Sequence, residues 1–184
     1  MRLEATLTRE DLGHIVSDLA PVRIRLGDKG ELHLADPSDV SLIAGRGLRV
    51  VCTAELSWAV LGFSVPITLK SLVLIVEPSI EERGDLQALI FRLHIESADI
   101  VGVPQVIGAR ATEFVRTSLA EKHVELAWSF SKTLSHTFAF PAMLENIASI
   151  ALEVAGASLT VTSDTLVFGV VFGTRVGRRP GVSA

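Results

Sequence analysis

Hydrophobic and polar residues alternate along most of the chain, which is the pattern of β-strands with one buried face. The longest stretch of this kind runs from Leu48 to Ile95 and contains three successive alternating segments. Strands of this length predict a long, twisted antiparallel sheet that is apolar on one side. After residue 123 the alternation resumes, and it predicts further strands that end in a C-terminal hairpin around Ser163 and Asp164.

Two segments have helical spacing instead. Thr8 is a good N-cap, and an apolar stripe follows it as far as Leu19, just before Pro21. The longer pattern begins at Pro104, and its small residues would let the helix lie close to a sheet or leave room beside it. The chain is therefore predicted to be an α+β protein, with a single domain over residues 1–176 and a disordered tail over 177–184.

Two details of the central stretch need interpretation. Pro66 interrupts a strand pattern, which predicts an edge position or a bulge near the start of that strand. The segment Glu77–Asp85 is polar and contains an acidic cluster at Glu81, Glu82 and Asp85. It is predicted to be a solvated loop, because acid/base catalysis would require one of these carboxyl groups to be surrounded by apolar neighbours.

Composition excludes several classes of protein. Hydrophobic residues make up 48% of the 184 residues, yet charged residues interrupt every apolar run before the roughly 20 residues that a membrane span needs. The net charge is −4 and the basic residues are scattered, so nucleic acid is not an expected partner. Three arginines near the end, at positions 175, 178 and 179, would give only weak contact with an anionic membrane surface.

The expected location follows from the first residues. They lack the apolar core of a secretory signal, so the product is expected to be cytoplasmic as the sequence stands. If a leader was removed, the location would be periplasmic or membrane-associated.

No catalytic, metal or cofactor motif is found. The five histidines do not have zinc-ligand spacing, and the sequence lacks nucleophile-elbow, phosphate-loop and dinucleotide motifs. Cys52 lies between Val50 and Ala54 on the apolar face of its strand, where a thiolate is disfavoured. We therefore expect no catalytic residue, no metal and no cofactor, and a protein that is not an enzyme.

Large aromatic residues at core-facing positions are the remaining candidates for a site. Either they pack the interior or they line a ligand cavity, and the sequence alone leaves both open. These residues are Trp58, Phe114, Trp128, Phe130 and Phe168.

The order of these elements resembles the tubular lipid-binding (TULIP) superfamily, and within it the small bacterial single-domain members related to the YceB-type lipoproteins. The chain lacks the lipobox cysteine of those lipoproteins, since Cys52 is internal. The segments that carry the resemblance are Thr8–Leu19, Leu48–Ile95, Gly102–Lys122, Phe140–Leu144 and Ser158–Asp164.

The resemblance implies a long, strongly twisted antiparallel sheet wrapped around a long α-helix, with a second, shorter N-terminal helix. It also implies an apolar groove or tunnel between sheet and helix that takes a lipid or fatty-acid-like ligand, with transient membrane contact. The expected lining residues are Leu74, Phe91, Leu93, Ile107, Ala111, Phe114, Trp128, Phe130 and Phe168.

Two interpretations of the high content of apolar residues stay open. The first is non-enzymatic binding or transport of a lipid or other elongated hydrophobic ligand. The second is a structural or assembly module whose surplus forms a filled core and an oligomer interface. The sequence does not determine the oligomeric state.

Overall fold

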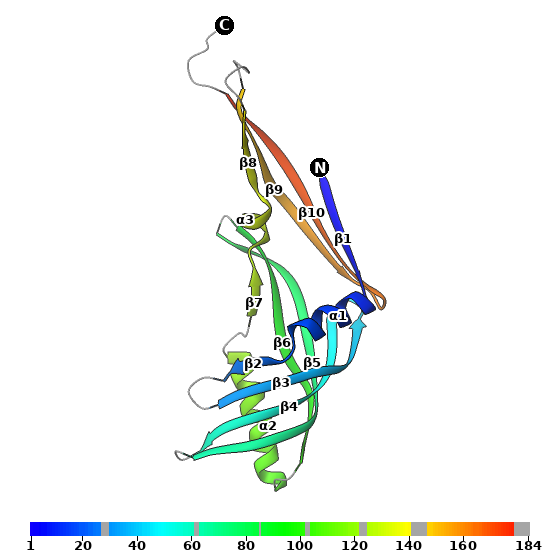
Figure 1. Cartoon of the computed structure of the whole chain (residues 1–184), viewed down its shortest axis with the longest axis vertical. Helices are drawn as coiled ribbons and strands as arrows, with labels where there is room; N and C mark the ends of the chain where they lie inside the picture. The colour runs from blue at the N-terminus through cyan, green and yellow to red at the C-terminus, as the bar shows by residue number, and fades with distance from the viewer. Residues whose placement is uncertain are drawn as a thin grey trace.

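The computed structural model describes residues 1–26, 30–60, 63–84, 86–101, 104–121, 125–140 and 147–178. In this part of the chain, two antiparallel sheets curl into half-barrels and follow one another along an elongated molecule (Figure 1). We refer to the four-stranded sheet as sheet A and to the six-stranded sheet as sheet B.

Sheet B has the strand order β2-β3-β4-β5-β6-β7, so each strand pairs with its sequence neighbour. Alternation explains this meander, because one face of every strand is apolar and can share one core. The strands are β2 (Val22–Arg25), β3 (Gly30–Ile43), β4 (Gly47–Val60), β5 (Phe63–Arg83), β6 (Leu86–Val101) and β7 (Glu125–Trp128).

Sheet A has the order β1-β10-β9-β8 and joins the two ends of the described chain. The N-terminal strand β1 pairs along β10, with Leu3 opposite Val170 and Leu7 opposite Leu166. The strands are β1 (Arg2–Thr8), β8 (His136–Ala139), β9 (Ile147–Val161) and β10 (Thr165–Arg178).

Three helices occur in the described residues: α1 (Arg9–Leu19), α2 (Gln105–Glu121) and α3 (Phe130–Leu134). The predicted cap of α1 is confirmed, because the Thr8 hydroxyl accepts from the Asp11 backbone N–H and the Asp11 carboxylate accepts from the Thr8 backbone N–H. The Thr8 hydroxyl also donates to the Asp11 carboxylate at 2.7 Å, and this bond, together with the one from the Thr8 backbone N–H, lowers the pKa of Asp11 below its ordinary value. Helix α3 was not predicted from the sequence.

The predicted fold class is wrong. Strands make up 70% of the described residues and helices 20%, and no long helix has a sheet wrapped around it there. Helix α2 has 17 residues, about 26 Å at 1.5 Å per residue, and packs against sheet B. The C-terminal strands do not continue round this helix, because they pair with β1 to form a separate sheet.

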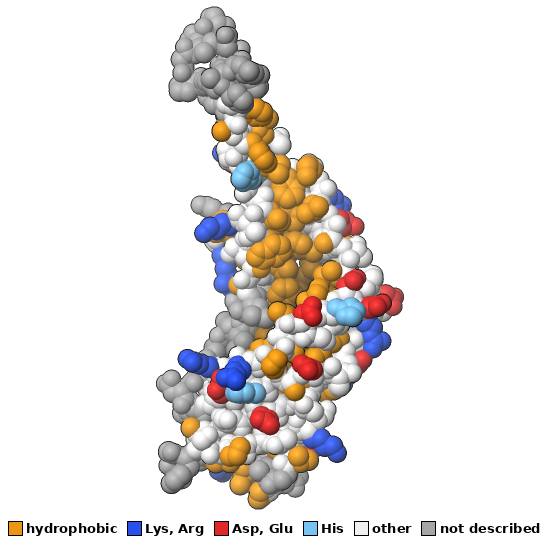
Figure 2. Space-filling model, viewed as in Figure 1, with side chains coloured by type: hydrophobic (Ala, Val, Ile, Leu, Met, Phe, Trp, Pro, Cys, Tyr) orange, Lys and Arg blue, Asp and Glu red, His pale blue; other side chains and the backbone are white. Residues whose placement is uncertain are grey.

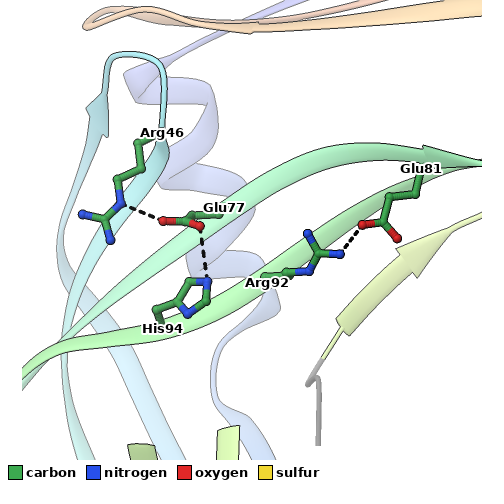
Figure 3. A network of polar contacts seen from close by, with 5 residues as sticks. All are labelled: Arg46, Glu77, Glu81, Arg92 and His94. Atoms are coloured by element: carbon green, nitrogen blue, oxygen red, sulfur yellow. Dashed lines mark hydrogen bonds and ion pairs between the residues drawn. The ribbon is translucent and has the colours of Figure 1, made fainter. Parts of the chain in front are cut away.

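The polar segment Glu77–Asp85 is not a loop as far as Arg83. It continues β5, and its residues pair with β6 from Glu77 opposite Arg92 to Arg83 opposite Leu86. Cross-strand ion pairs account for a polar strand here. Figure 3 shows Glu77 between Arg46 and His94, and Arg92 beside Glu81. The Arg46 Nε atom lies 2.7 Å from Glu77 Oε1, and the His94 Nε2 atom lies 3.3 Å from Glu77 Oε2.

Pro66 lies at a position of β5 that does not need a backbone N–H. It pairs with Ser57 of β4, whereas the pairing of β5 with β6 begins only at Thr68. Its side of β5 therefore has no described strand that would need a backbone N–H at this position.

Candidate functional site

The inner face of sheet A is the candidate site. Strand register defines it, because residues opposite one another in an antiparallel pair project from the same face. Over residues 3–7, 136–138, 150–161 and 166–176, apolar residues occupy every position of this face except two, His136 and Thr174. The face consists of Leu3, Ala5 and Leu7 of β1; Leu166, Phe168, Val170, Phe172, Thr174 and Val176 of β10; Ile150, Leu152, Val154, Ala157, Leu159 and Val161 of β9; and His136 and Phe138 of β8.

The opposite face of the same sheet is polar or small at most positions. Arg2, Glu4 and Thr6 of β1 alternate with the apolar set, and Arg175 of β10 forms an ion pair with Glu153 of β9 at 3.0 Å. Figure 2 shows a continuous apolar area over sheet A above α1. Sheet A is therefore apolar on one face and mostly polar or small on the other.

Burial changes along the inner face. Near its middle, Val170 and Phe172 are buried, and they pack with Phe130 of α3 and Leu89 of β6. Toward the free end of the sheet the cover stops, since Phe138 and Val176 are each 52% exposed. Leu3, on the edge strand β1, is 50% exposed as well. Part of this apolar face is therefore in contact with solvent.

Three aromatic rings mark the covered part. Phe130 and Phe168 meet edge to face at 5.1 Å between ring centroids, and Trp128 lies 6.1 Å from each. Helix α3 is held in place by the Ser131 hydroxyl, which accepts from the Gln87 backbone N–H and donates to the Gln87 carbonyl. Trp128 remains 41% exposed, so the cluster is open on one side.

Sheet B differs from sheet A because helix α2 covers its inner face. Ala111, Val115 and Leu119 of α2 are buried to 3% exposure or less against the inner face of the sheet. Phe114 of the same helix stacks on Trp58 of β4, with 5.4 Å between ring centroids. The helix thus takes the place that a ligand would need in this sheet.

The predicted lining residues fall into two groups. Phe91, Trp128, Phe130 and Phe168 come together where sheet A meets β6. The others lie in sheet B or on α2: Leu74 and Ala111 are buried, Leu93 and Phe114 pack against that core, and Ile107 is 41% exposed.

Most of the open part of the inner face was not among the predicted residues. Leu3, Phe138, Leu152 and Val176 belong to it. Their alternation is visible in the sequence, but the pairing of β1 with β10 joins residues about 165 positions apart, and no local signal reports it.

A separate surface depression of about 530 Å³ lies between α1 and β3. Its lining is mixed rather than apolar, and Arg9 crosses it to bind Asp39 at 2.7 Å and the Val40 carbonyl at 2.8 Å. His14 and Glu10 on α1 also line it. Because its charged groups pair with one another, it offers little to an apolar ligand.

The one cysteine of the chain, Cys52, is buried. Burial raises the pKa of the Cys52 thiol, which keeps it protonated. Within the described ranges, no three His, Cys, Asp or Glu side chains are grouped closely enough to hold a metal ion.

Comparison with known proteins gives no assignment, since neither a protein family model nor a curated protein matches the chain. None of the helices in the described part has the combined length and apolarity needed to cross a bilayer.

Proposed function

We propose that this protein binds a lipid or another elongated hydrophobic ligand without catalysing a reaction, and that the ligand lies along the inner face of sheet A. One observation carries this proposal. Up to residue 176 that face is apolar at all but two positions, yet it stays partly uncovered at Leu3, Phe138 and Val176. A contiguous exposed apolar area of this kind is typical of a binding surface.

The energetics are sufficient without any polar anchor. Burial of about ten methylene groups contributes roughly 8 kcal/mol before ordering and association costs. Leu166, Val170 and Phe172 of β10 are already buried, so the ligand would contact the uncovered residues of the face, among them Leu3, Phe138 and Val176.

Exchange of such a ligand would take place by transient contact with a membrane. The exposed side chains of Phe138 and Val176 at the free end of sheet A support this part of the proposal, because apolar tips of this kind enter the interfacial region of a bilayer.

A matched pair of substitutions on β10 tests the proposal. Val176 is on the inner face and 52% exposed, whereas Val171 is on the outer face and 46% exposed. Val176→Glu places a charge in the ligand path, and Val171→Glu places the same charge outside it. We expect titration with a fluorescent fatty acid to show binding by the wild type and by Val171→Glu, and at least tenfold weaker binding by Val176→Glu.

Organic extraction of the purified protein, followed by mass spectrometry, provides the complementary test. We expect a lipid to be recovered from the wild type. A protein that yields no lipid and binds no fluorescent fatty acid would contradict the proposal.

The same uncovered face also supports the second function, an assembly module whose apolar face is covered by another copy of the chain. Exposed Leu3 and Val176 would then lie in an oligomer interface. Sedimentation analysis separates the two: a stable oligomer that Val176→Glu dissociates and that binds no lipid would favour assembly.

A further inference from the structure

Strand β1 is an outer strand of sheet A, and among the described strands only β10 pairs with it (Figure 1). Met1 and Phe172 form a hydrogen-bonded pair, because the nitrogen of each donates to the carbonyl oxygen of the other, at 3.1 and 2.8 Å. Such pairs alternate with non-hydrogen-bonded pairs along an antiparallel ladder. The backbone N–H and C=O groups of Arg2, Glu4 and Thr6 therefore point away from β10, toward the outer edge of the sheet.

The outer strands of the two sheets differ in how they are protected against pairing with another chain. Short length, β-bulges and proline are the usual protections. Strands β2, β7 and β8 have four residues each. Strand β1 has seven residues, contains no proline, and pairs with β10 without a bulge. Six of its seven residues are exposed, so a further strand has access to its edge.

We propose that β1 pairs with β1 of a second copy of this chain, in the antiparallel register that places Leu3 opposite Leu3. In this register Arg2 of each copy is opposite Glu4 of the other, and these residues exchange backbone N–H···O bonds. Their opposite charges meet on the outer face of the joined sheet, which is favourable. Leu3 is 50% exposed on the inner face, and the pairing brings the two Leu3 side chains into contact.

The alternative registers of the same strand fit less well. The register centred on Glu4 places two like charges directly opposite each other. The register centred on Ala5 places Arg2 opposite Thr8, whose backbone N–H already donates to the Asp11 carboxylate at 2.9 Å. The sequence Arg2-Leu3-Glu4 is thus complementary to itself in an antiparallel pair. This self-complementarity favours a second copy over an unrelated peptide as the partner.

The pairing lengthens sheet A at its edge and goes beyond the function proposed above, on which it does not depend. A ladder this short buries less surface than a standard protein interface. We therefore expect a weak dimer whose population rises with protein concentration, and an inner face that stays open in each copy.

Disulfide formation tests the register. Leu3→Cys and Ala5→Cys are a matched pair, because both residues are exposed on the inner face of β1, and Cys52→Ala leaves each variant with one cysteine. Opposed Leu3 residues have Cα atoms about 4.5 Å apart, within the range of a disulfide, whereas the two Ala5 residues are separated by about 13 Å along the strands. We expect mild oxidation to link Leu3→Cys into a dimer at least about tenfold faster than Ala5→Cys. Equal rates, or faster linkage of Ala5→Cys, would overturn the proposed register.

Charge reversal tests whether Arg2 and Glu4 recognise each other between copies. Arg2→Glu alone and Glu4→Arg alone each place like charges opposite one another, so we expect dimers at least about tenfold weaker than that of the wild type. An equimolar mixture of the two variants pairs opposite charges again and should recover the dimer. Analytical ultracentrifugation over a concentration series measures this.

Two results of the sedimentation experiment would overturn the inference. One is a wild type that stays monomeric up to about 1 mM, which leaves the edge to an extended peptide of another protein or to no partner. The other is a mixture that associates no more than its two components. Neither experiment uses a lipid, so its failure is distinguishable from failure of the proposed ligand binding. A thermal unfolding curve for each variant verifies that the fold is intact.

Discussion

The two half-barrels of this protein are both antiparallel sheets with an apolar inner face, but other parts of the chain cover these two faces to different extents. In sheet B, the residues Ala111, Val115 and Leu119 of α2 pack against the inner face and complete its core. Sheet A has an equally apolar inner face, which α3 and the ends of β5 and β6 cover in part, while Leu166 near one end packs in the same core as sheet B. The difference shows that an apolar sheet face needs a partner, and that only one of these two has its full partner within the described chain.

The connection between the two half-barrels gives the largest predicted effect. Phe130 is completely buried and contacts Phe168 of sheet A and Trp128 of β7. We expect Phe130→Ala to lower the free energy of unfolding by about 4 kcal/mol, as for other buried phenylalanines. Urea unfolding measures this loss. A loss below about 1 kcal/mol would mean that sheet A is held to β6 by other contacts.

A pair of leucine truncations compares the filled sheet with the open one. Leu72 of β5 is fully buried in the core of sheet B, whereas Leu152 of β9 is only partly buried. We expect Leu72→Ala to lower the free energy of unfolding by about 3 kcal/mol and Leu152→Ala by about 1 kcal/mol. Equal losses in urea unfolding would contradict the difference in packing between the two sheets.

The alternation of the chain predicted the strands well and their assembly poorly. The first strand pattern after Leu48, the cap at Thr8 and the helix after Pro104 are local signals, and the structure confirms each, whereas the loop predicted at Glu77–Asp85 is a strand as far as Arg83. The assembly depends on distant partners: β1 completes a sheet with β10, and this leaves α2 to sheet B alone. Sequence periodicity carries no information about such pairings.

The site shows the same limit. Trp128, Phe130 and Phe168 were recognised as large core-facing aromatics, and the structure brings them together. Leu3, Phe138 and Val176 were not recognised as part of the site, because only the strand register places them together on one apolar face.

The ion pairs on the outer face of sheet B should matter much less than its core. Glu77 binds Arg46 of the turn between β3 and β4 and His94 of β6, but its side chain is 34% exposed (Figure 3). We expect Glu77→Gln to lower the free energy of unfolding by less than about 1 kcal/mol, and the effect to shrink at high salt. Urea unfolding at low and high ionic strength measures both. A larger, salt-independent loss would assign a structural role to this network.

Cys52 in the filled sheet gives the smallest effect, as a dependence on pH. Burial raises the pKa of its thiol in the folded state above the unfolded value of about 8.5. Its contribution to stability is therefore complete below that unfolded value and is lost as the pH rises through the folded one. We expect Cys52→Ala to remove this alkaline loss, measured by urea unfolding between pH 7 and pH 10. An unchanged slope would assign the loss to other groups.

Hydrogen–deuterium exchange with and without a long-chain fatty acid tests the central contrast most directly. The ligand should slow amide exchange in β8, β9 and β10 of sheet A, and it should leave β3, β4 and β5 of sheet B unchanged, because their inner face is already covered by α2. Slower exchange in sheet B alone, or no change in either sheet at saturating ligand, would contradict the assignment of the open half-barrel as the binding site.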